Sequence, residues 1–460
     1  MRTHTNMTMD NRTYYNYFGD YKKLKVYGVM EEVSLNHRAT DIYNGGNITV
    51  SSSSSVTPNF NLYTSGICYK NVGNDKPNDT LMIEKGYVGS LHNCINNGEI
   101  RYTNGDIINT TSKITASGEF YGVSRAAGIT CINSSTISQT FNLGDVYNIN
   151  GIIPISNTYG GYGASEQFEV ETGGICFIMQ NEQYDSTGDL TSGNIVDSAN
   201  NGVIVSMNTN NNRGFTNAGG FVGRNDRGED GILVNETSSS ERSHTSKIQY
   251  SINYGDIYAY NEYTQVIYGG EQQSKAAGFV CLGACTIVDV INYGNIYGNS
   301  VSAGMFGFLY ISRMRTAGMS PTSPIYIANS INYGSVRVTE QNAENANKIY
   351  DIGNTKQKVT VRNSSNLPTN ESSNTRIYVA GALIGAWAFR SNDDDVRSIN
   401  VKYLVNFDDQ VNILGNNLVR ISALPIFSSV WINLHITYLR YVNRKRWKVQ
   451  KTIVLYKCFI

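Results

Sequence analysis

Charge, proline and helix-favouring residues are all scarce in this sequence. Only 16% of its 460 residues are charged, against the ~25% usual in globular proteins, and only 7 are proline. Basic and acidic residues are balanced at 37 each, so the net charge gives no bias toward nucleic acid or acidic lipid. The shortage of helix formers argues against a helical bundle or a doubly wound α/β enzyme.

The sequence also lacks the common signatures of metal, redox and catalytic sites. Its seven cysteines fit no disulfide framework or zinc pattern, and only Cys281 and Cys285 lie close together. There is no H-E-x-x-H, no G-x-S-x-G and no P-loop. The acids Glu99, Asp145 and Asp256 recur at equivalent positions, which favours solvated corners over one active site. We therefore predict no cofactor, no metal and no enzymatic activity.

Two short patterns repeat along the chain instead. It contains 55 Asn, 44 Gly and 32 Tyr. The first pattern, Asn-x-Gly-x-(Ile/Val), begins at residues 44, 96, 142, 200, 253, 292 and 332. The second is a small residue and Gly followed by apolar residues, and it begins at residues 65, 127, 173, 219, 277, 303 and 380.

The repeat is a true internal duplication. Residues 126–147 and 276–297 align without a gap, and nine of the 22 positions are identical. In these two copies 16 residues separate the pattern glycines, whereas 28 to 35 separate them in the other copies. Fixed elements joined by loops of variable length are typical of stacked repeats.

The apolar runs within one repeat are too short for helices. Gly-Phe-Val, Thr-Ile-Val-Asp-Val-Ile and Asn-Ile-Tyr span three to six residues and are rich in β-branched and aromatic types. They predict an all-β fold, a parallel β-solenoid resembling a right-handed β-helix, with three strands per coil and about seven or more irregular coils. We expect a cap or lead-in at 1–40, the solenoid at 41–410 and a basic, apolar tail at 411–460.

The repeated residues have structural explanations. We expect each pattern Asn to adopt a left-handed corner conformation and to hydrogen-bond to its equivalents in a ladder. The pattern glycines would supply positive φ or close backbone approach, with those of the second pattern in one column. Cys68, Cys131, Cys176 and Cys281 share one position with Gly223, Gly307 and Gly385, so we expect buried, dispensable thiols there. The predicted repeat residues are Asn96, Gly98, Gly128, Asn142, Gly144, Gly174, Gly220, Asn253, Gly255, Gly278, Asn292, Gly294, Gly304, Asn332 and Gly334.

The motif Gly219-Gly-Phe-Val-Gly223, followed by Asn-x-Gly-x-Ile, resembles the GLUG-type repeats of bacterial surface proteins. The resemblance covers roughly residues 40–410, and the Asn-Tyr-Gly variant departs from it. It implies a relationship to β-solenoid adhesins, autotransporter passengers and secreted peptidases. The repeat specifies a scaffold and not an activity.

The two ends of the chain differ from the repeat. The N-terminus has no apolar segment typical of a secretory signal, so export would depend on sequence outside this chain. From Val411 onward there are eight basic residues and no acid, and an apolar stretch at 421–439 precedes a basic cluster. This tail could be a membrane anchor, a truncated or frame-shifted end, or a cap, and any membrane contact would involve it alone.

The sequence favours a surface-exposed or secreted structural or adhesive protein. We expect its solenoid to display loops that bind a host surface protein or glycan, with the loop at about 340–375 as the main contact. The alternatives are a polysaccharide lyase or hydrolase on the same scaffold and a non-functional fragment of a larger surface protein. A groove that holds two or three clustered carboxylates would favour the enzyme.

Overall fold

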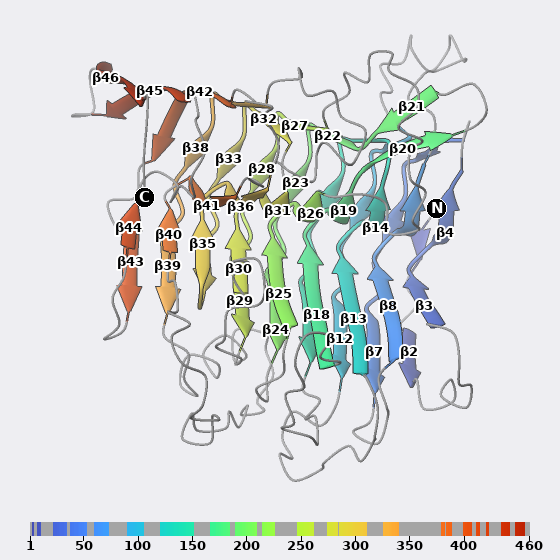
Figure 1. The fold of residues 1–460 in the computed structure, drawn as a ribbon. Coiled ribbons are helices and arrows are strands. Elements are labelled where there is room, and N and C mark those ends of the chain that lie inside the picture. The colour runs from blue at the N-terminus through green and yellow to red at the C-terminus, as the bar shows by residue number, and fades with distance from the viewer. Residues whose placement is uncertain are drawn as a thin grey trace, which may run out of the picture.

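The computed structural model has strands and no helix among the residues it describes. These are residues 2–3, 7–10, 22–34, 37–52, 59–72, 90–104, 120–150, 166–184, 189–208, 214–225, 246–261, 274–283, 285–310, 325–339, 379–381, 383–388, 399–406, 411–414, 420–422, 434–441 and 447–455. Their strands stack in parallel register, as Figure 1 shows, so the chain is a parallel β-solenoid, as predicted.

Five parallel sheets run along the stack, and we number them I to V in chain order within a coil. Sheet I contains β3 (Lys22–Tyr27), β8 (Asn59–Ser65), β13 (Phe120–Ala127), β18 (Glu166–Gly173), β25 (Gly214–Gly219), β30 (Ser274–Ala277), β35 (Val301–Ala303), β40 (Val379–Gly381) and β44 (Arg420–Ser422). Sheet II contains β4 (Met30–Val33), β9 (Cys68–Asn71), β14 (Thr130–Asn133), β19 (Cys176–Met179), β26 (Val222–Asn225), β31 (Val280–Gly283), β36 (Phe306–Tyr310) and β41 (Ile384–Ala388).

The remaining sheets complete each coil. Sheet III contains β5 (Ala39–Thr40), β10 (Leu91–His92), β15 (Thr136–Ser138), β22 (Asn194–Val196), β27 (Lys247–Gln249), β32 (Thr286–Val288), β37 (Ile325–Ala328), β42 (Ile399–Asn406) and β45 (Leu434–Tyr441). Sheet IV contains β1 (Arg2–Thr3), β6 (Tyr43–Asn44), β11 (Ile95–Asn96), β16 (Phe141–Asn142), β23 (Ala199–Asn200), β28 (Ile252–Asn253), β33 (Ile291–Asn292) and β38 (Ile331–Asn332), which also pairs with β42. Sheet V contains β2 (Met7–Asp10), β7 (Ile48–Ser52), β12 (Ile100–Asn104), β17 (Val146–Asn150), β24 (Ile204–Asn208), β29 (Ile257–Asn261), β34 (Ile296–Gly298), β39 (Val336–Thr339) and β43 (Val411–Leu414).

Two antiparallel pairs interrupt the parallel pattern. Strands β20 (Asn181–Tyr184) and β21 (Asp189–Ser192) form a hairpin, and β46 (Trp447–Leu455) pairs with β45. The parallel ladders extend past both boundaries predicted for the solenoid, because β3 pairs with β8 and β43 pairs with β39. The described part of the chain has no helix that could span a membrane.

The prediction of three strands per coil is wrong, because a complete coil has five. The run Thr286–Ile291 is divided between β32 and β33 by Asp289, whose φ is 55°. Six other corner residues also have positive φ, each three positions before a pattern Asn: Asp41, Asn93, Gln139, Asp197, Tyr250 and Asn329. The left-handed corner is therefore at this earlier residue. The pattern Asn itself ends a strand of sheet IV and faces inward, which explains why it is not at the corner.

The predicted Asn ladder runs through the interior. Each Nδ2 donates to Oδ1 of the Asn in the next coil at 2.7–2.9 Å, in the order Asn44, Asn96, Asn142, Asn200, Asn253, Asn292 and Asn332. Each also donates to the backbone oxygen of its own pattern Gly, for example Asn96 to Gly98 at 2.9 Å. These amides are buried, so the ladder satisfies groups that would otherwise be costly to bury.

The pattern glycines are needed for close backbone approach and not for positive φ. A Cβ at Gly98 would lie 1.9 Å from the backbone oxygen of Gly46, and Gly144 would meet Gly98 in the same way at 2.0 Å. The glycines of the first pattern thus form a column, which continues through Gly202, Gly255, Gly294 and Gly334. Among the described residues, Gly283 alone of the glycines has positive φ.

The glycines of the second pattern form a column that packs against the Asn ladder. A Cβ at Gly128 would lie 2.2 Å from the oxygen of Gly174 and 2.3 Å from Cγ of Asn142. The column continues from Gly174 through Gly220 and Gly278 to Gly304. This contact separates two hydrophobic clusters, one between sheets I and V and one lined by sheets II and III. The two sequence patterns therefore meet across the interior of the coil, at Gly66, Gly128, Gly174, Gly220 and Gly278.

Candidate functional site

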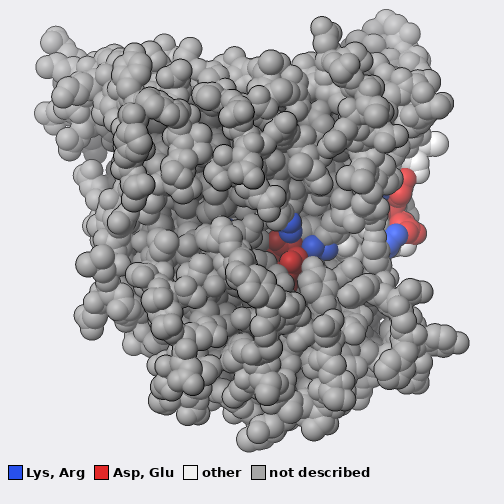
Figure 2. All heavy atoms as spheres, in the orientation of Figure 1, with Lys and Arg blue, Asp and Glu red and all other residues white. Residues whose placement is uncertain are grey.

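The residues predicted to stabilise the repeat lie in the interior of the solenoid. A separate group of charged residues lies on the outside of sheets I and II. Figure 2 shows basic and acidic atoms side by side in the middle of the face drawn in Figure 1. The described cluster comprises Tyr63, Arg125, Glu169, Glu171, Asn217 and Arg224, and we call it the charged cluster.

Strand register brings these residues together. On sheet I, Tyr63 pairs with Arg125, Arg125 with Glu171 and Glu171 with Asn217. Glu169 lies two residues before Glu171 on β18, so its side chain is on the same face of the sheet. Arg224 reaches the cluster from β26 of sheet II. Four successive coils thus contribute to one site.

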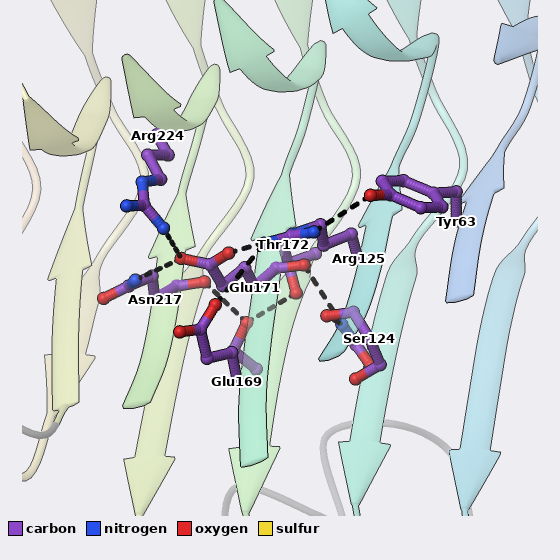
Figure 3. Close-up of polar contacts among 10 residues, drawn as sticks. Tyr63, Ser124, Arg125, Glu169, Glu171, Thr172, Asn217 and Arg224 are labelled. Carbon is purple, nitrogen blue, oxygen red and sulfur yellow. Dashed lines mark hydrogen bonds and ion pairs between the residues drawn. The ribbon is translucent and has the colours of Figure 1, made fainter. Parts of the chain in front are cut away.

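Arg125 is the centre of the cluster. Its Nε donates to Glu171 Oε2 at 3.2 Å, Nη1 to the Tyr63 hydroxyl at 3.1 Å and Nη2 to Glu169 Oε2 at 3.4 Å. The guanidinium carbon also lies 4.8 Å from the ring centre of Phe177. The side chain is only 6% exposed, so these contacts replace its hydration and fix its plane (Figure 3).

Glu171 is a buried carboxylate with several donors around it. Its side chain is 1% exposed, and its Oε1 accepts from Asn217 Nδ2 at 2.7 Å and lies 3.7 Å from Arg224 Nη1. Burial alone would raise the pKa of this carboxyl group. Arg224, Arg125 and the hydrogen bond from Asn217 outweigh burial and hold the pKa of Glu171 below its ordinary value. The group is therefore ionised at neutral pH and is a poor proton donor.

The backbone beneath the cluster is held from inside the coil. Asn148 of sheet V donates to the backbone oxygens of Ser124 and Glu171 at 2.8 and 3.0 Å, and it accepts from the Ser124 hydroxyl at 2.8 Å. These bonds fix strands β13 and β18, and hence Arg125 and Glu171, relative to each other. The cluster is a rigid arrangement of charges, suited to recognition of a polar partner.

Two of the three acids predicted to be solvated corners, Asp145 and Asp256, link successive coils instead. Asp145 Oδ1 accepts from the backbone N–H of Val203 at 2.8 Å, and Asp256 Oδ1 accepts from that of Asn295 at 2.7 Å. Glu99 forms an ion pair with Arg101 at 2.6 Å. Among the described residues, no group of three His, Cys, Asp or Glu side chains is placed to hold a metal ion.

The prediction that these cysteines share one position with glycines holds for Cys131 and Cys281, which align with Gly223, Gly307 and Gly385, and is wrong for Cys68 and Cys176. Cys176 pairs with Thr130 and Val222, one residue before the position of Gly223, whereas Cys131 lies between Thr130 and Ile132 and aligns with Phe177. Cys68 also pairs with Thr130. Because side chains alternate along a strand, this one-residue shift puts Cys68 and Cys176 on the opposite face from Cys131. Phe177 further shows that the position accepts a large side chain.

All six cysteines that the structure describes are buried and outside disulfides. Burial raises the pKa of Cys68 and Cys94 to about 12, and it also raises the pKa of Cys176, Cys281 and Cys285. We expect none of the six to react with Ellman's reagent at pH 8 in the native protein, and all to react after unfolding. Rapid native labelling of two or more thiols would contradict this, since only Cys458 lies outside the described residues.

The loop predicted to bind at 340–375 lies outside the described residues, so the charged cluster is the candidate site that the structure supplies. Comparison with known proteins assigns no function to the charged cluster. No family model, no curated protein and no solved structure matches the chain.

Proposed function

We propose that this protein is a surface-exposed or secreted adhesive solenoid, whose stacked coils present a binding face to a host protein or glycan. The observation that carries the proposal is the charged cluster: buried charged groups fixed by hydrogen bonds and ion pairs across four coils. Fixed charges of both signs suit recognition of a polar partner, since they orient a ligand without having to reorganise.

An enzyme that cleaves polysaccharides is the second candidate, because Glu169 and Glu171 place two carboxylates around one arginine, Arg125. Cleavage by the usual carboxylate pair needs one group that is protonated at working pH. Glu171 does not fit that role, because its pKa is lowered by Arg224 and Arg125. We therefore favour binding over catalysis. Release of new reducing ends from a polysaccharide by the wild type, lost in Glu171→Gln, would reverse this preference.

Arg224→Ala tests the binding role. Arg224 is the most exposed side chain among the three ion pairs of the cluster, at 18%, so its removal should spare the fold. We expect binding to the best ligand found on arrays of glycans and matrix proteins to fall about tenfold, the loss of one charged contact. Equilibrium binding of both proteins measures this.

Arg101→Ala is the matched control. Arg101 is 15% exposed and also pairs with a glutamate, Glu99, but it lies on sheet V. The two variants thus remove similar groups from different faces. Equal effects of both on affinity, or no effect of Arg224→Ala, would exclude the charged cluster as the binding site.

A further inference from the structure

A row of exposed tyrosines runs along another corner of the solenoid. Tyr254, Tyr293 and Tyr333 each follow a ladder Asn directly, in the Asn-Tyr-Gly variant of the first pattern. They are 48%, 42% and 40% exposed. Among the described residues, the only other exposed large hydrophobic side chains are Leu143, in the same column, and Tyr250. Exposed aromatic side chains are therefore concentrated along one line, and we call the three stacked rings of Tyr254, Tyr293 and Tyr333 the tyrosine strip.

The three rings are stacked and firmly held. Ring centres are 5.2 Å apart between Tyr254 and Tyr293 and 4.9 Å apart between Tyr293 and Tyr333, with planes within 4° of parallel. If the ring planes are in contact at roughly 3.5 Å, centres this far apart correspond to a sideways offset of about 3.5 Å. Each ring thus covers only part of the next ring, and the rest of that ring's face stays exposed. The backbone N–H of each tyrosine donates to the backbone oxygen of the ladder Asn in the previous coil at 2.7 Å.

Half-buried isoleucines widen the strip on its sheet IV side. Ile252, Ile291 and Ile331 precede the ladder Asn in the same three coils and face outward. Tyr250, which is 59% exposed, lies at the next corner. The result is a flat, narrow, apolar surface with tyrosine hydroxyls, extending across three coils along the solenoid axis.

Area and charge limit what this surface can bind. With ~200 Å² per aromatic side chain, the three exposed rings offer on the order of 250 Å², well below the ~800 Å² per partner of a stable protein interface. The strip itself is uncharged, and the neighbouring corner column carries the acids Asp197 and Asp289. An acidic polymer would be repelled there. A narrow, neutral, linear ligand fits best.

We propose that the tyrosine strip binds a neutral, linear polysaccharide that lies along the solenoid axis. The C–H faces of its sugar rings would rest on the open parts of the tyrosine rings, and its hydroxyls would exchange hydrogen bonds with the tyrosine hydroxyls. Each sugar unit of an extended β-linked chain has a length similar to the rise of one coil, so successive units meet successive rings. The proposal rests on the proposed adhesive function and adds to it a second surface and a ligand class.

The test is retention on insoluble cellulose, xylan and mannan. The triple variant Tyr254→Ser, Tyr293→Ser, Tyr333→Ser should lose at least roughly tenfold in retention on the polymer that the wild type binds best. Its circular dichroism and thermal unfolding should stay close to those of the wild type, because the side chains are outside the core. Leu143→Ser, in the same column but outside the stack, is the matched control and should bind as the wild type does.

A gain-of-binding variant makes the test independent of any loss of stability. Asn201→Tyr places a ring in the one position between Leu143 and Tyr254 in this column, which extends the stack to four rings. We expect retention to rise about threefold, in line with one added aromatic contact. Unchanged retention in both the triple variant and Asn201→Tyr would overturn the proposal.

The remaining outcomes separate this proposal from the adhesive function. Wild-type binding that Arg224→Ala abolishes and the tyrosine variants do not would reject the strip and support the charged cluster. A wild-type dimer that the triple variant converts to a monomer would assign the strip to contact with a second copy of the chain. Failure of the wild type to bind any of the three polymers would also reject the strip, whereas arrays of matrix proteins and charged glycans would still test the adhesive function.

Discussion

Asn200→Ala is expected to destabilise the solenoid by about 4 kcal/mol, because it breaks the ladder at its middle. The Asn200 side chain donates to Gly202 O at 3.0 Å and to Asn253 Oδ1 at 2.8 Å, and it accepts from Asn142 Nδ2 at 2.8 Å. Alanine leaves these three buried groups without their partner, and each such group costs ~1–3 kcal/mol. Relaxation of the neighbouring coils offsets part of that cost. Denaturant unfolding followed by circular dichroism measures the change.

The adjacent residue provides a matched control. Asn201 is chemically identical and one position further along the chain, but its side chain is exposed. Asn201→Ala should change stability by less than about 0.5 kcal/mol. Because each coil contacts only its neighbours, the Asn200→Ala transition should also become broader or biphasic as the stack divides at that coil. Similar stabilities of the two variants would mean that the ladder contributes little.

The ladder could be predicted from sequence, because a side chain that repeats once per coil must face its own copies. The prediction failed on finer geometry. Asp289 forms a corner within what looked like one strand, and Tyr250 does the same in its coil although tyrosine rarely adopts positive φ. Stacking forces every coil to turn at the same place, so register overrides the local preference of the residue there. Local propensity therefore predicted too few strands.

The charged cluster was missed because charged residues within strands are not a recognised motif. A signal was nevertheless present. Three residues before the glycine of the second pattern, successive copies have Tyr63, Arg125, Glu171, Asn217 and Lys275, and the structure pairs these residues in that order. Alignment of the copies on that glycine would have shown a polar column with adjacent opposite charges. Arg224 could not have been found this way, since it comes from another sheet.

Gly174→Ala is expected to destabilise the protein severely, because the added methyl group would overlap two neighbours that are held in place. The new Cβ would lie 2.0 Å from the backbone oxygen of Gly220 and 2.6 Å from Cγ of Asn200. Neither neighbour can move freely: the oxygen belongs to the next coil of the glycine column, and Asn200 is held by the ladder on both sides. Overpacking in a close-packed core usually costs ~1–3 kcal/mol, and here backbone must shift as well, so we expect a loss of at least about 4 kcal/mol or insoluble protein.

Gly223→Ala is the control for Gly174→Ala. It tests whether the loss of stability comes from steric overlap or from any replacement of a repeat glycine by alanine. Its Cβ would lie 2.9 Å from the Thr172 oxygen and 3.2 Å from Cδ2 of Phe177, a much weaker overlap than at Gly174. By strand register, an adjacent coil has Phe177 at the same position, so a side chain can be accommodated there. We expect Gly223→Ala to be soluble and to lose no more than about 2 kcal/mol in the same unfolding experiment. A Gly174→Ala protein as stable as Gly223→Ala would show that the glycine column does not pack tightly against the Asn ladder.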